Sequence, residues 1–133
     1  MELPVLVDSN IYIGLLRRGH DPVAVLFEHY DVTSLVTCGM IRLEVLRGVR
    51  IPKTLERLSA FMDVMHYVEA DSRLWSEAIT LAARTDHKGT PVSATDAFIA
   101  ACAFRTGASV LTEDKDFKFI ADLPLLSLPP GIW

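Results

Sequence analysis

Short apolar runs alternate with longer helix-like segments through most of the chain, and this alternation is the strongest constraint on its fold. A continuous apolar run bounded by polar turn residues is typical of a strand buried on both faces of a sheet. When helices separate such strands, each connection crosses over a face of the sheet, which favours parallel pairing. We therefore predict an α/β fold, a three-layer α/β/α sandwich with a mostly parallel central sheet. The predicted strands cover residues 3–7, 32–36, 64–68 and 109–111.

Cap residues and helical spacing define the segments between these strands. Ser9 or Asn10 can open the first helix, and Thr37 can open the helix that follows the second strand. Pro52 suits the first turn of a helix, and Ser93 is a candidate N-cap. The predicted helices cover residues 11–17, 23–30, 38–47, 52–62, 72–87 and 93–107.

The composition is that of one domain with one core. The chain has 133 residues, of which 50% are hydrophobic and 23% charged, so we expect a single domain over residues 1–133. Apolar stretches stay well short of the ~18 residues that a membrane span needs, and the N-terminus lacks the basic region of a signal peptide. We therefore expect a cytoplasmic protein with no membrane partner. Residues 123–133 are rich in proline and should be extended.

The cysteines and histidines do not indicate a zinc site. Cys38 and Cys102 lie far apart in the sequence, within predicted helices, and neither belongs to a CxxC or Cys/His pattern. We expect both to be reduced core residues. The histidines show no metal-ligand spacing either; they are His20, His29, His66 and His87.

The formal net charge is −4 at pH 7. An acidic chain does not hold nucleic acid by bulk electrostatics alone. A metal-dependent nuclease is still compatible with this charge, because bound divalent ions are the largest local charges in such a site and attract phosphate.

Asp96 is the only charge in residues 92–104, the most apolar helix-like run of the chain. In a helix its face would be shared with Ile99, Ala100 and Ala103. A carboxylate in such surroundings must be protonated, hydrogen-bonded, ion-paired or bound to a cation, since burying an unpaired charge costs several kcal/mol. A simpler interpretation stays open, in which Ser93 caps the helix and Asp96 completes a capping box.

Other acidic side chains stand where an α/β sheet carries its ligand sites, beyond the carboxyl ends of the strands. Asp8 directly follows the first strand, Asp114 and Asp116 follow the last predicted one, and Glu44 lies in the helix after the second. Each also has a purely structural explanation. The aspartates could cap helices, and Glu44 could pair with Arg47 at the surface.

The joint pattern of these carboxylates favours a site for a hard divalent cation, because Mg²⁺ prefers oxygen ligands and two such ions can clamp a phosphodiester. The sequence has no P-loop, dinucleotide-binding glycine motif or Ser- or Cys-nucleophile motif. A phosphatase with an aspartyl nucleophile at Asp8 is a rival, but such enzymes need a second Asp where this chain has Asn10.

In their order and spacing, four motifs resemble the PIN domain family and, within it, the VapC-like toxin ribonucleases of prokaryotic toxin–antitoxin pairs. The resemblance implies hydrolysis of RNA by an acidic quartet that holds one or two Mg²⁺ or Mn²⁺ ions, homodimerisation, and inhibition by a cognate small antitoxin. The motifs are residues 8–10, 41–48, 95–101 and 111–117. The residues that the resemblance implies are Asp8, Glu44, Asp96 and Asp114 as the quartet, Asp116 as a supporting acid, and Ser9, Asn10 and Thr112 as polar groups that orient the carboxylates.

Two alternatives within the same fold remain, a stand-alone RNA-processing nuclease and a catalytically inert binding module. All four quartet positions are acidic, which favours catalysis. Glu113 departs from the pattern, because many relatives carry a basic or neutral residue there, and this acid weakens the local attraction for RNA. Apolar residues of the first two helices and of residues 52–62 are candidates for the dimer face.

Overall fold

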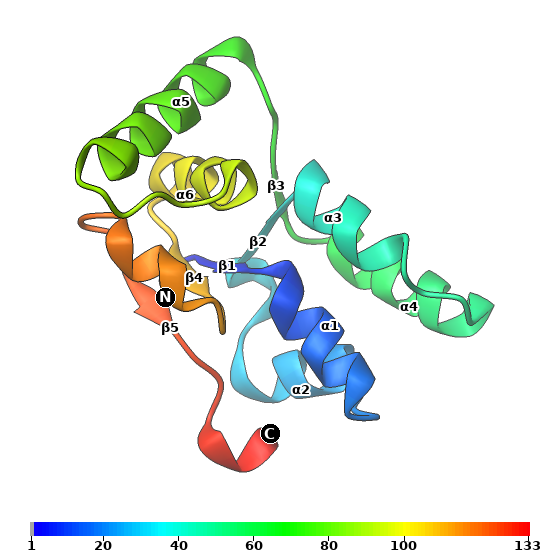
Figure 1. Cartoon of the computed structure of the whole chain (residues 1–133). Helices are drawn as coiled ribbons and strands as arrows, with labels where there is room; N and C mark the ends of the chain where they lie inside the picture. The colour runs from blue at the N-terminus through cyan, green and yellow to red at the C-terminus, as the bar shows by residue number, and fades with distance from the viewer. Residues whose placement is uncertain (1) are drawn as a thin grey trace.

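The computed structural model describes residues 2–133, and in this part of the chain five strands pair in parallel to form one sheet (Figure 1). The strand order is β3-β2-β1-β4-β5. β1 and β4 therefore lie side by side although a large part of the chain separates them, and Val7 is aligned with Leu111. The strands are β1 (Val5–Val7), β2 (Leu35–Cys38), β3 (His66–Val68), β4 (Ser109–Leu111) and β5 (Leu125–Leu126).

Helices cover both faces of this sheet, which confirms the predicted α/β/α sandwich. α5 packs against α6 on one side, and four shorter helices lie together on the other (Figure 1). On that second side, α1 contacts α2 and α3, and α4 contacts the same two helices. The helices are α1 (Ser9–Arg17), α2 (Pro22–His29), α3 (Gly39–Leu46), α4 (Pro52–Asp63), α5 (Ser72–His87) and α6 (Ala94–Thr106).

α6 is the most deeply buried helix of the described chain, with every residue from Asp96 to Ala103 buried. Its small side chains explain how it fits between the sheet and α5, because alanine lets backbones approach closely. The helix ends at Gly107, whose φ of 68° is the left-handed conformation that glycine adopts without steric cost. Ser93 is its N-cap, as predicted.

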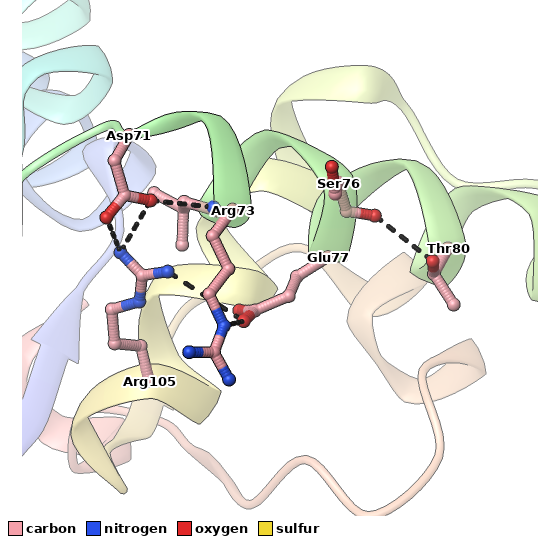
Figure 2. Close-up of polar contacts among 7 residues, drawn as sticks. Asp71, Arg73, Ser76, Glu77, Thr80 and Arg105 are labelled. Carbon is pink, nitrogen blue, oxygen red and sulfur yellow. Dashed lines mark hydrogen bonds and ion pairs between the residues drawn. The ribbon is translucent and has the colours of Figure 1, made fainter.

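Ion pairs join the end of α6 to the beginning of α5 (Figure 2). The guanidinium of Arg105 lies 3.0 Å from the carboxylate of Asp71, the N-cap of α5, and 3.8 Å from Glu77. Arg73 approaches the same Glu77 at 3.5 Å. These exposed pairs contribute little stability. They show that α5 and α6 run antiparallel, so the first turn of α6, with Asp96, lies at the other end of the helix pair.

The structure corrects the predicted beginning of two helices. Asp8, and not Ser9 or Asn10, caps α1. Thr37 does not cap α3, because β2 continues through Cys38, which is the N-cap and makes no side-chain cap hydrogen bond. Cys38 is therefore a strand residue. The predicted strand over residues 32–36 is displaced because a 3₁₀ turn, η1 (Val32–Ser34), precedes β2.

The tail is extended in part, as predicted, and it ends in a short turn. β5 adds a parallel strand beside β4, and a 3₁₀ turn, η3 (Pro130–Ile132), ends the chain described. Another 3₁₀ turn, η2 (Lys115–Phe119), follows β4. Within residues 2–133, none of the helices combines the length and apolarity that a bilayer span requires.

Candidate active site

Asp8 and Thr112 follow the two neighbouring strands β1 and β4 at their carboxyl ends. The chain leaves β1 toward β2 on one side and returns to β4 on the other, so the sheet changes direction here, which is where ligands bind in open α/β sheets. The backbone N–H of Asp8 donates to the carbonyl of Leu111 at 2.9 Å. The hydroxyl of Thr112 donates to Asp8 Oδ2 at 2.8 Å, while Asp8 Oδ1 accepts the N–H of Ser9 at 2.8 Å. Both carboxylate oxygens of Asp8 are thus fixed.

The Thr112 hydroxyl also organises the loop that follows β4. It accepts the side-chain amide of Asn10 at 3.1 Å and the backbone N–H of Asp114 at 2.9 Å. The carbonyl oxygen of the same Asn10 amide accepts the backbone N–H of Glu113 at 3.2 Å. One hydroxyl therefore connects the side chain of Asp8 to the backbone of Asp114, and Asn10 holds the residue between.

Asp114 caps η2, since its Oδ1 accepts the backbone N–H of Asp116 at 2.9 Å. The helix-cap explanation considered for Asp114 is therefore correct as far as it goes. Asp116 is exposed, and its hydrogen bond to Asp114 is made through its backbone N–H. Within residues 2–133, no hydrogen bond or ion pair joins the Asp116 carboxylate to the other acids.

Asp96 occupies the third position of α6, and its backbone N–H donates to Ser93 Oγ at 3.0 Å. Its side chain is buried, with 7% of the residue exposed. Burial, the hydrogen-bonded carboxyl of Asp114 and the negative charges of Asp114 and Asp8 together raise its pKa to about 7. Asp96 therefore has both roles considered from the sequence: its backbone is part of the Ser93 cap, and its side chain belongs to a group of acids.

Asp8 experiences the same surroundings. Burial raises the pKa of its carboxyl, and the charges of Glu44 and Asp114 act in the same direction. The hydrogen bonds from Thr112 and Ser9 oppose this effect without cancelling it. Like charges that face one another in a partly desolvated site explain the direction of both shifts.

Glu44 enters the site from α3, beyond β2. It is half-buried, and its Oε1 atom is fully buried without a hydrogen-bond partner among residues 2–133. Thr37 Oγ1, near the end of β2, is in the same condition. Buried polar atoms are rarely left unpaired, and binding of an ion or a water is one physical explanation. The ion pair of Glu44 with Arg47, an alternative from the sequence, does not occur in the described chain.

The donor set fits a hard divalent cation. It consists of carboxylate oxygens, one of which lacks any partner, and two of the carboxyls have raised pKa values that a bound cation would lower. The side chains do not yet converge to ligand distances, since no three Asp, Glu, His or Cys residues of the described chain form a compact group.

The structure thus brings Asp8, Asp96 and Asp114 together, with Glu44 close enough for its charge to act on Asp8. Ser9, Asn10 and Thr112 bond to this group as described above, while Asp116 stands apart. The sequence indicated Thr37 only as a helix cap; it lies one residue before the end of β2, with a buried hydroxyl that has no partner among residues 2–133. A hollow of about 600 Å³ lies at the opposite edge of the sheet, lined by residues such as Pro4, Ser34 and Thr106, and none of the predicted site residues lines it.

Comparisons with known proteins agree with this geometry. The sequence matches the PIN domain family over residues 5–123. It is 27% identical over 128 residues to "Ribonuclease VapC4" of Mycobacterium tuberculosis, covering 92% of this chain and 95% of that relative. Two solved structures share the fold. DNA-bound VapBC from Salmonella typhimurium superposes with a TM-score of 0.76 at 20% identity, covering 96% of this chain and 100% of that one. VapBC-1 from nontypeable Haemophilus influenzae superposes with a TM-score of 0.74 at 17% identity, covering 95% and 98%. The chain therefore belongs to the PIN domain family.

Proposed function

We propose that this PIN domain is a divalent-metal-dependent endoribonuclease that hydrolyses RNA phosphodiester bonds, and that it is the toxin of a type II toxin–antitoxin system. The observation that carries the proposal is the grouping of Asp8, Asp96 and Asp114 at the point where the sheet changes direction, where burial and neighbouring negative charge raise the pKa of Asp8 and of Asp96. The similarity to a relative named as a ribonuclease supports the choice of RNA.

In this proposal the four quartet acids, Asp8, Glu44, Asp96 and Asp114, hold one or two Mg²⁺ or Mn²⁺ ions. Such ions, when bound, supply a Lewis acid that activates water and neutralises phosphate charge. The chain's own groups keep the acids in place.

Thr112 and Ser9 fix both oxygens of Asp8. Ser93 fixes the backbone of Asp96. Asp114 and Asp116 are the candidate acceptors for the proton that the attacking water gives up, and the exposed Asp116 carboxylate has access to solvent.

We further propose that residues 1–133 act as one nuclease domain in the cytoplasm, as a homodimer bound by a small antitoxin. An apolar groove of about 470 Å³ between α2 and α4 supports a protein partner. Phe27 and Val64 line it with 56% and 64% of their surface exposed, and adjoining exposed apolar residues are typical of a surface that binds another protein.

The test is cleavage of a defined single-stranded RNA by the purified protein with MgCl₂ or MnCl₂, with EDTA, and with Asp96→Asn. We expect cleavage with either metal, none with EDTA, and none with folded Asp96→Asn. Cleavage that survives EDTA or Asp96→Asn contradicts the proposal. Tight RNA binding without cleavage in any metal identifies an inert binding module. A small gene beside this one whose product blocks cleavage supports the toxin role, and its absence favours a stand-alone RNA-processing nuclease.

A further inference from the structure

The segment that follows β5 folds back onto α1, next to the loop that carries Asp114. Leu128 is buried, and Ile132 and Trp133 pack against the core. The indole N–H of Trp133 donates to Glu113 Oε1 at 3.1 Å. This hydrogen bond joins the last described residue to the residue between Thr112 and Asp114.

One face of α1 supports both ends of that hydrogen bond. Asn10, Gly14 and Arg18 are spaced four residues apart and so lie in a row along the helix. Asn10 holds the backbone of Glu113, as described above. The guanidinium carbon of Arg18 lies 4.6 Å above the Trp133 ring, an arrangement typical of a cation–π contact.

The indole of Trp133 packs directly against Gly14. A Cβ atom added at this position would lie 3.0 Å from two ring atoms of Trp133, Cη2 and Cζ3. The close approach of the ring, and not the backbone conformation, favours glycine here, because α1 is regular at this point. A side chain at this position would require the indole to shift by a few tenths of an ångström or more.

The consequence concerns the charge of Glu113. Gly14 lies six residues beyond Asp8, about 9 Å along the helix at 1.5 Å per residue. The Trp133 hydrogen bond thus ties the Glu113 carboxylate to an indole that packs on the middle of α1, under the guanidinium of Arg18. Without it, an exposed carboxylate next to Asp114 would be free to repel an approaching phosphate.

We propose that Trp133 is a positioning residue of the nuclease. Seated on Gly14 and covered by Arg18, its indole N–H holds the Glu113 carboxylate away from the path of the RNA. This inference rests on the proposed function for its substrate.

The variants separate charge from packing. Trp133→Phe keeps an aromatic ring but removes the donor, Gly14→Ala pushes the indole outward, and Glu113→Gln removes the charge. Trp75→Phe is the matched control, because it is the same change on α5, away from Glu113. The Trp75 ring packs against that of Phe98, with 4.5 Å between the ring centroids. Steady-state cleavage of a fluorescein-labelled single-stranded RNA gives kcat and KM. Fluorescence anisotropy of the same RNA gives the binding affinity, and for this measurement each variant also carries Asp96→Asn, so that the RNA is not cleaved.

At low salt, we expect Trp133→Phe and Gly14→Ala to raise KM and weaken binding by about 3- to 10-fold, with kcat changed less than about twofold. Adding Glu113→Gln should restore the parental KM in both. The defect should shrink in 0.5 M NaCl, because salt screens exposed charges. Trp75→Phe should change none of these values.

A loss that appears in kcat, or one that Glu113→Gln leaves in place, would assign Trp133 a purely structural role and overturn the proposal. An NMR measurement separates this outcome from failure of the proposed function. The indole N–H resonance of Trp133 should shift on Glu113→Ala while that of Trp75 does not, whether or not the protein cleaves RNA. An unchanged Trp133 resonance contradicts the hydrogen bond itself.

Discussion

The Asp96 carboxyl lies in the first turn of α6 with its backbone bonded to Ser93 and its side chain among other acids. The positive end of the helix favours its ionised form, whereas burial and the neighbouring charges of Asp114 and Asp8 favour the protonated form. The raised pKa shows that the second group of effects dominates in the absence of a cation. At the scale of single residues, the acidic cluster therefore opposes the stability of the fold that carries it.

This opposition predicts a pH dependence of stability. Because the pKa of Asp96 rises from 3.8 to about 7 on folding, the folded chain binds the proton more tightly than the unfolded one. The free energy of unfolding should therefore fall by on the order of a few kcal/mol as pH rises from about 4 to about 7, with Asp8 acting in the same direction.

Asp96→Asn should flatten this slope and make the metal-free protein more stable than wild type at pH 8. Urea unfolding in EDTA at pH 5 and pH 8 measures both effects. Asp86→Asn, an exposed change on α5, is the control and should keep the wild-type slope. A slope that Asp96→Asn leaves unchanged means that another group dominates the titration.

Glu44 provides a second prediction at this scale, about metal binding. Its buried Oε1 lacks a partner in the described chain, so a bound cation would satisfy it. A ligand that binds only the folded protein stabilises it in proportion to the logarithm of its concentration. We expect MgCl₂ to raise the Tm of wild type and to raise that of Glu44→Gln much less.

Glu56→Gln on the exposed face of α4 is the control and should respond to Mg²⁺ as wild type does. The Tm in EDTA and in 10 mM MgCl₂, measured at one pH, gives the comparison. An equal response of Glu44→Gln and wild type would remove Glu44 from the ligand set.

At the scale of elements, the site depends on how the ends of β1 and β4 are joined. The Thr112 hydroxyl contacts Asp8, Asn10 and the backbone of Asp114, so it sets the distance between two acids on different elements. Thr112→Val keeps the shape of the side chain and removes these bonds. Leaving buried polar groups unpaired costs about 1–3 kcal/mol.

We expect Thr112→Val to lower kcat for RNA by about 100-fold or more, because misplaced catalytic groups lose rate steeply. Thr85→Val is a matched control, since Thr85 is also buried but bonds to the carbonyl of Ala82 within α5. It should lower stability by a similar amount and leave kcat unchanged. Comparable kcat values for the two variants would show that the hydroxyl network is not needed for cleavage.

The elements also show what the sequence could and could not predict. The cap at Ser93 and the glycine end of α6 were predicted correctly, because both depend on residues within the helix itself. The predicted cap of α3 was wrong because pairing with β3 extends β2 through Cys38. β5 was missed because two residues are too short to show a strand period.

At the scale of the whole molecule, the strand order β3-β2-β1-β4-β5 makes the site. Periodicity indicates which segments are strands, but not which strands become neighbours, so Asp8 and Thr112 could be placed together only through resemblance to a family. The contact of Trp133 with α1 carries no sequence signal at all, since its partners Gly14, Arg18 and Glu113 share no pattern with it.

The two tryptophans allow a test of whether the two helix layers unfold cooperatively. Trp75 lies on α5, on one side of the sheet, and Trp133 lies against α1, on the other. Both helix layers bury residues in one continuous core, so they should unfold together. In Trp133→Phe the fluorescence reports the α5 layer, and in Trp75→Phe it reports the α1 layer.

For each single-tryptophan variant, we expect the urea midpoint from fluorescence to coincide with the midpoint from circular dichroism. Trp133→Phe should shift both midpoints to lower urea together, because it removes one hydrogen bond and part of a packed surface. The comparison is made within each variant, so this loss of stability does not bias it. Separate midpoints in either variant would mean that the α1 side, with Asp8 and Glu44, can open while α6 and Asp96 remain folded, and the four acids would then not belong to one cooperative unit.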